Sequence, residues 1–196
     1  LDLERATALL GVACYVAASL LAGGLLIWTP SRGVRAARVL LAVGATLLAA
    51  VLIGGWVRAA AIPVFNRFDA MTCYALALSG AYLLMGASCH ARGIACLLIP
   101  AATVILLSGV SAGEGGAGEP APVQGPWLVL HVVTAFAAYG VFTVASISAA
   151  AYLIQDSNLK HKRFGLIWER LPSLEALDQN MSRLVGVAFL LLTCSI

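Results

Sequence analysis

The chain has 196 residues, of which 61% are hydrophobic and 11% are charged, and its formal net charge is +3. A soluble domain has roughly 45–50% apolar and about 25% charged residues, so this chain has too few charges to cover a surface in water. The composition excludes a soluble enzyme, a nucleic-acid-binding protein and a disordered regulator. It predicts an integral membrane protein with the lipid bilayer as its solvent.

Charge-free apolar stretches predict an all-α fold, a polytopic transmembrane helical bundle, because each span needs about 20 apolar residues. We expect about six spans in a single transmembrane domain, 1–196. In chain order they cover residues 6–28, 39–57, 70–88, 93–110, 127–154 and 184–196. The last apolar run still continues at Ile196, so we expect this span to be truncated and the chain to be part of a longer protein.

Two connecting segments have a composition of their own. The Gly- and Pro-rich segment 111–126 is expected to form a flexible external loop. Segment 155–183 is expected to be cytoplasmic and amphipathic, with Ser173 placed to cap a helix. Apolar residues then recur at intervals of three and four, at Leu174, Leu177, Met181 and Leu184. This helix is expected to run into the last span.

The basic residues predict the orientation. Three of them, Arg5, Arg58 and Arg67, lie on one side of the expected membrane. The other side carries nine: Arg32, Arg35, Arg38, Arg92, Lys160, Lys162, Arg163, Arg170 and Arg183. Because the richer side faces the cytoplasm, the N-terminus is expected outside. The Ala- and Gly-rich composition indicates a bacterium, and hence its inner (plasma) membrane.

His131 is the strongest candidate site residue. It lies four residues after Trp127, just inside the outer end of the fifth span, and the expected spans contain no Asp, Glu, Lys or Arg. A neutral imidazole at this depth is suited to be an axial ligand of haem iron. The alternative is a histidine that hydrogen-bonds to a carbonyl of a neighbouring helix. Side chains on the same helical face would let a flat macrocycle approach: Thr134, Ala135, Ala138 and Phe142.

Other residues complete the candidate set. The guanidinium groups of Arg58 and Arg67 are candidates to bind haem propionates, with interfacial snorkelling or an Arg67–Asp69 pair as the alternative. His90 and His161 lie beside basic residues and are expected to be solvated. The cysteines form no C-x-x-C or C-x-x-C-H motif, and we expect no catalytic side chain and no zinc site.

From about residue 60 onward, the chain resembles the cytochrome c assembly protein family, of the CcsA/ResC type. The matching stretches are WLVLHV followed by Tyr139 and Phe142, NLKHKRFGLIWERLPSLEALD, GVAFLLLT, CLLIPAATVILL and IPVFNRFDAM, in which Asp69 replaces a glutamate of the family. The resemblance implies that His131 binds haem (haem b) at the outer face, with Trp127 beside it, and that the haem is presented to apocytochrome c. The family's tryptophan-rich WWD segment and later histidines would follow Ile196.

The resemblance leaves three functions open. The first is a haem-handling protein that works with a partner membrane subunit and forms part of a cytochrome c haem lyase. The second is a regulator of haem metabolism like the HemX/YpjD sister group, acting through segment 155–183. The third is a non-catalytic helical subunit of a larger membrane complex.

Overall fold

A computed structural model gives the fold of the chain. It describes residues 2–24, 31–59, 66–85, 89–111, 125–161 and 173–196. Within these ranges it contains six helices and no strand: α1 (Asp2–Gly24), α2 (Ser31–Ala59), α3 (Arg67–Leu84), α4 (Cys89–Val110), α5 (Pro126–Lys160) and α6 (Leu174–Cys194). The predicted all-α class is therefore confirmed. Most of the expected external loop, and Lys162, Arg163 and Arg170, lie outside the described residues.

Apolar composition identifies the membrane-crossing helices. Three described stretches are long and apolar enough to cross a bilayer: Leu3–Gly24 in α1, Gly33–Arg58 in α2 and Trp127–Lys160 in α5. A shorter apolar stretch, Ile94–Val110, lies in α4. Pro100 lies inside this helix. The molecule is a transmembrane helical bundle.

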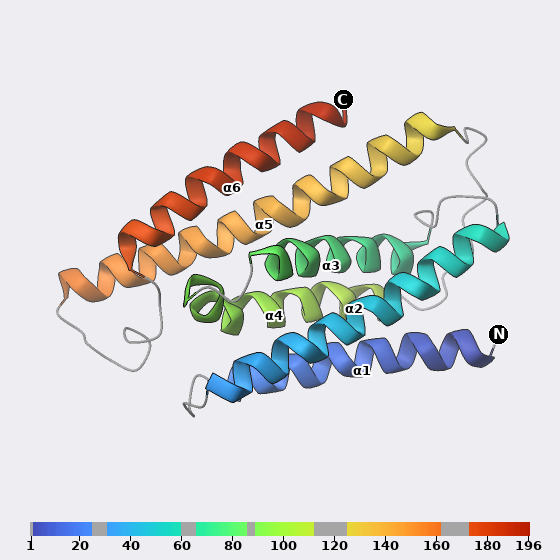
Figure 1. The fold of residues 1–196 in the computed structure, drawn as a ribbon, viewed down its shortest axis with the longest axis horizontal. Helices are drawn as coiled ribbons and strands as arrows, with labels where there is room; N and C mark the ends of the chain where they lie inside the picture. The colour runs from blue at the N-terminus through green and yellow to red at the C-terminus, as the bar shows by residue number, and fades with distance from the viewer. Residues whose placement is uncertain (1, 25–30, 60–65, 86–88, 112–124, 162–172) are drawn as a thin grey trace.

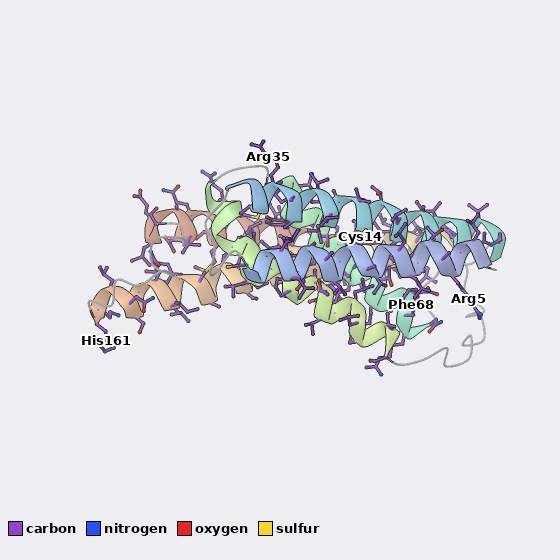
Figure 2. All side chains as sticks on the ribbon, turned by 90° about the horizontal axis from the view of Figure 1, so that it is seen from below. Arg5, Cys14, Arg35, Phe68 and His161 are labelled. Carbon is purple, nitrogen blue, oxygen red and sulfur yellow. The ribbon has the colours of Figure 1, made fainter. Side chains whose placement is uncertain are left out.

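The helices alternate in direction along the long axis of the bundle (Figure 1). One end, here called the Arg67 end, holds the start of α1, the end of α2 and the starts of α3 and α5. The opposite end, the Lys160 end, holds the end of α1 and the start of α2. There α5 projects past the neighbouring helices. Arg5 and Phe68 lie toward the first end, and Arg35 and His161 toward the second (Figure 2).

Close helix contacts and buried hydrogen bonds hold the first four helices together. Gly11 and Gly44 let α1 and α2 approach, since a Cβ on Gly44 would lie 3.0 Å from the carbonyl oxygen of Gly11. The buried hydroxyls of Tyr15 and Ser79 join α1 to α3 at 2.8 Å, and Thr103 Oγ1 donates to the Tyr15 carbonyl oxygen at 3.1 Å. In lipid, such packing and hydrogen bonding replace the hydrophobic effect as the force between helices.

The last two helices form a hairpin at the edge of the bundle (Figure 1). α5 packs on α3 and α6 packs along α5. Ser173 is the N-cap residue of α6, but its side chain makes no capping hydrogen bond. α6 then continues without a break from the amphipathic stretch into the apolar one, with Leu177 and Ala188 buried. This hairpin positions the candidate histidine.

Candidate functional site

His131 lies in the second turn of α5, at the Arg67 end. The helix begins after Gly125, the N-cap, with Pro126 in the first turn, where the missing N–H of proline costs no hydrogen bond. The His131 Nδ1 atom makes a hydrogen bond with the backbone carbonyl oxygen of Ser195 at the end of α6. The structure therefore contains the carbonyl contact that the sequence offered as the alternative to a ligand.

This contact determines which nitrogen of the His131 ring keeps a lone pair. A carbonyl oxygen only accepts, so Nδ1 carries the proton and donates it. In the neutral imidazole, the lone pair is then on Nε2, which has no hydrogen-bond partner among the described residues. Ligating histidines commonly donate their second ring N–H to a carbonyl or carboxylate, which fixes both tautomer and orientation. The carbonyl contact is thus compatible with an axial ligand.

The helical face next to His131 differs from the expectation. α6 meets this face, as the Ser195 contact shows, and Ala138 on it is fully buried. The Thr134 hydroxyl donates to the carbonyl oxygens of Leu130 at 2.6 Å and His131 at 3.1 Å. α6 therefore packs over this face at Ala138, whereas Thr134, Ala135 and Phe142 are only partly buried. Trp127, one turn earlier on α5, is 81% exposed.

The two arginines lie at the same end of the bundle, in different surroundings. Arg58, near the end of α2, pairs through Nη2 with Oε1 of Glu4 on α1. Arg67 begins α3, is exposed, and makes no ion pair with Asp69 or any other described residue. Asp69 is half-buried, and this burial raises its pKa above the ordinary aspartate value.

α3 packs against the side of α5 that points away from His131. A Cβ on Gly140 would lie 2.6 Å from the carbonyl carbon of Ala77, so α3 meets α5 at Gly140. His131 and Gly140 are about two and a half helical turns apart and so face opposite ways. The structure therefore brings His131 to Ser195, and it does not gather Arg67 on the same face of α5.

The remaining candidates do not form a metal centre. Within the described ranges, no group of three His, Cys, Asp or Glu side chains is placed to hold a metal ion. His161 follows α5 at the Lys160 end and is exposed, far from His131 (Figure 2). The side chain of His90, in the first turn of α4, lies outside the described part. A single imidazole suits haem, whose porphyrin supplies the other iron ligands.

Sequence reasoning missed two features of this end. One is Ser195, because a backbone acceptor leaves no signal in the side-chain pattern. The other is an apolar groove of about 400 Å³ between α2, α3 and α5. Its lining includes Trp56, Cys73 and Phe136. Their apolar spacing is the same as that of ordinary core residues, so only the structure reveals the groove.

Comparisons with known proteins match most of the chain. A family model described as Cytochrome C assembly protein matches residues 64–196. Protein HemX of Brevibacillus brevis is 40% identical over 68 residues, covering 34% of this chain and 25% of that protein. Cytochrome c biogenesis protein CcsA of a Synechococcus strain is 29% identical over 133 residues, covering 63% of this chain and 39% of that protein. The matches thus span less than half of either relative. No solved structure matches the chain.

Proposed function

The chain belongs to the cytochrome c assembly protein family, and on this premise we propose that it acts in cytochrome c biogenesis by holding haem for attachment to apocytochrome c. Haem b is held at the outer face of a bacterial inner membrane, and the N-terminus of the chain is also outside. The biased distribution of basic residues supports this orientation. Arg35, Arg38 and Lys160 lie toward the Lys160 end, which faces the cytoplasm.

The observation that carries the proposal is the His131–Ser195 contact. Because Nδ1 donates to the Ser195 carbonyl, the ring presents Nε2 as the donor atom for iron. Trp127, one turn before His131 and largely exposed, offers an aromatic surface to the macrocycle. His131 and Trp127 are the haem-binding pair of this proposal.

The protein residues bind and orient the cofactor. Haem itself supplies the vinyl groups that react with the thiols of an apocytochrome. Arg58 and Arg67 remain predicted propionate partners at the same end. Glu4 already neutralises Arg58, whereas Arg67 keeps its charge available. A partner membrane subunit and the tryptophan-rich segment known from the family complete the site.

A second function is supported by one comparison. The similarity to Protein HemX favours the alternative that the resemblance left open, a regulator of haem metabolism, which would contact a cytoplasmic enzyme through segment 155–183. Loss of such a regulator would change haem synthesis while c-type cytochromes still mature from supplied haem. Loss of the proposed haem-handling protein stops maturation even when haem is plentiful.

The test measures haem in the purified full-length protein and c-type cytochromes in the cells that express it. His131→Ala is compared with His161→Ala, an exposed histidine at the opposite end of α5. We expect His131→Ala to lower the haem-to-protein ratio, from the pyridine haemochrome, at least tenfold, and to lower covalent cytochrome c in parallel. His161→Ala should change neither. Unchanged haem content in His131→Ala would reject the ligand assignment.

A further inference from the structure

The apolar groove at the Arg67 end lies outside the proposed haem site. Its walls are helices α2 and α5 and its floor is α3, with a volume of about 400 Å³ that falls within the usual range of ligand sites. The lining residues are Leu52, Ile53, Trp56, Cys73, Leu76, Ala77, Val129, Val132, Val133, Phe136 and Ala137. It lies on the face of α5 opposite to His131, so any occupant is separate from the proposed haem.

The position and the lining of the groove indicate which kind of ligand it binds. Both of its walls belong to stretches apolar enough to cross a membrane, so the groove lies at the depth of the lipid hydrocarbon. Apart from the Cys73 thiol and the Trp56 indole N–H, every lining side chain is aliphatic or a phenyl ring. Along α5 the lining runs from Val129 to Ala137, about 12 Å at 1.5 Å per residue. A narrow apolar site of this length suits a hydrocarbon chain.

The Asp69 carboxylate lies one helical turn from this groove, toward the start of α3. Asp69 precedes Cys73 by four residues on α3, so the two side chains lie on the same helical face. Asp69 is half-buried and has no hydrogen-bond or ion-pair partner among the described residues. A partly buried carboxylate without a partner favours a cationic hydrogen-bond donor.

We propose that the groove binds a phosphatidylethanolamine molecule, with one acyl chain between α2 and α5 and the ammonium group at Asp69. Ethanolamine supplies the N–H donors that the carboxylate lacks. Phosphatidylglycerol has the same chains but no ammonium group to donate to the Asp69 carboxylate. The preference therefore depends on the head group and the occupancy depends on the chain.

The experiment uses Trp56 as the reporter, because it lines the groove and its fluorescence is quenched by bromine atoms on a bound acyl chain. In the full-length protein, every tryptophan except Trp56 is replaced by phenylalanine. This protein is placed in vesicles that contain either brominated phosphatidylethanolamine or brominated phosphatidylglycerol, at equal mole fraction. A matched protein keeps only Trp127, which lies at the same end of the bundle outside the groove lining. We expect at least twofold stronger apparent binding of the ethanolamine lipid at Trp56, and no preference at Trp127.

Two substitutions separate the head group from the chain. Asp69→Asn should make the two lipids equal at Trp56, and Ala137→Phe, which fills the groove, should reduce quenching by both. Val104→Phe, on an exposed position of α4, is the control for added volume and should change nothing. Equal quenching by the two lipids in the Trp56 protein, or a preference that survives Asp69→Asn, would overturn the proposal. If the tryptophan variants misfold, native mass spectrometry of the unsubstituted protein gives the same comparison, and equal retention of the two lipids overturns it.

Discussion

The Nδ1 atom of His131 and the backbone carbonyl of Ser195 join the start of α5 to the end of α6. The two residues are 64 positions apart in the chain, and their contact depends on the antiparallel pairing of the two helices. The orientation of the candidate ligand therefore depends on the pairing of α5 with α6. This dependence can be tested separately from the ligand itself.

The first prediction concerns Ser195. Its backbone N–H donates to the carbonyls of Leu191 and Leu192 at 3.1 Å, and these bonds hold the carbonyl that His131 contacts. Ser195→Pro removes the N–H and should lower haem affinity by about 10- to 100-fold, as expected when the partner of a metal-ligating histidine is lost. Ser195→Ala keeps the backbone and should bind haem normally. Equal haem titrations for the two variants would show that the carbonyl does not orient the ring.

The second prediction concerns the contact between α3 and α5. A Cβ at Gly140 would lie 2.6 to 2.8 Å from backbone atoms of Ala77 and Leu78, which cannot move by a side-chain rotation. Gly140→Ala should therefore lower the free energy of unfolding by about 1–3 kcal/mol. Gly186→Ala on α6 meets nothing within 4 Å and should be neutral or slightly stabilising. Thermal melts in one detergent compare them, and an unchanged melting temperature for Gly140→Ala would contradict the helix contact.

The third prediction concerns the buried hydrogen bond between Tyr15 and Ser79. Tyr15→Phe leaves the Ser79 hydroxyl without this partner and should lower the free energy of unfolding by about 0.6–1.7 kcal/mol, the range for hydrogen bonds between membrane helices. Tyr139→Phe is the control, because Tyr139 is 48% exposed and contacts its neighbours through its ring. Reversible unfolding in mixed micelles measures both. An equal loss in the two variants would indicate that the hydrogen bond contributes nothing of its own.

The fourth prediction compares Arg58 and Arg67 as partners of the haem propionates. Arg58 is paired with Glu4, whereas Arg67 has no partner in the described part of the chain, so Arg67 has more charge available for a propionate. Arg67→Gln should speed haem transfer to apomyoglobin more than Arg58→Gln does. Glu4→Gln should slow the transfer by releasing Arg58, with little change in stability, because exposed ion pairs contribute about 0.2–1 kcal/mol. Identical transfer rates in all three variants would remove both arginines from the haem site.

The helices were predictable because their signal is local. Charge-free runs predicted an all-α fold, and the described residues form six helices and no strand. Asn66 is the N-cap of α3 and accepts from the Phe68 N–H at 3.3 Å, and asparagine is a residue type that commonly caps helices. Both features depend on residues within a few positions of each other.

The site was predictable only in part, because its geometry depends on which helices pair. His131 could be selected from the sequence as the polar ring of an otherwise apolar span. Its partner could not, since a backbone carbonyl has no sequence signature. The small residues near His131 indicated an open face for a macrocycle, yet the structure places α6 there and buries Ala138. Small residues favour close packing of a helix as much as they favour a flat ligand.

Rescue by free imidazole is the sharpest test of whether the His131 imidazole binds haem iron through Nε2. His131→Gly removes the ring and leaves space for an added imidazole at the same position. We expect the purified variant to lack the Soret band and millimolar imidazole to restore it when haem is supplied, whereas His161→Gly should bind haem without any addition. A His131→Gly protein that keeps a full Soret band without imidazole would show that His131 is not the ligand.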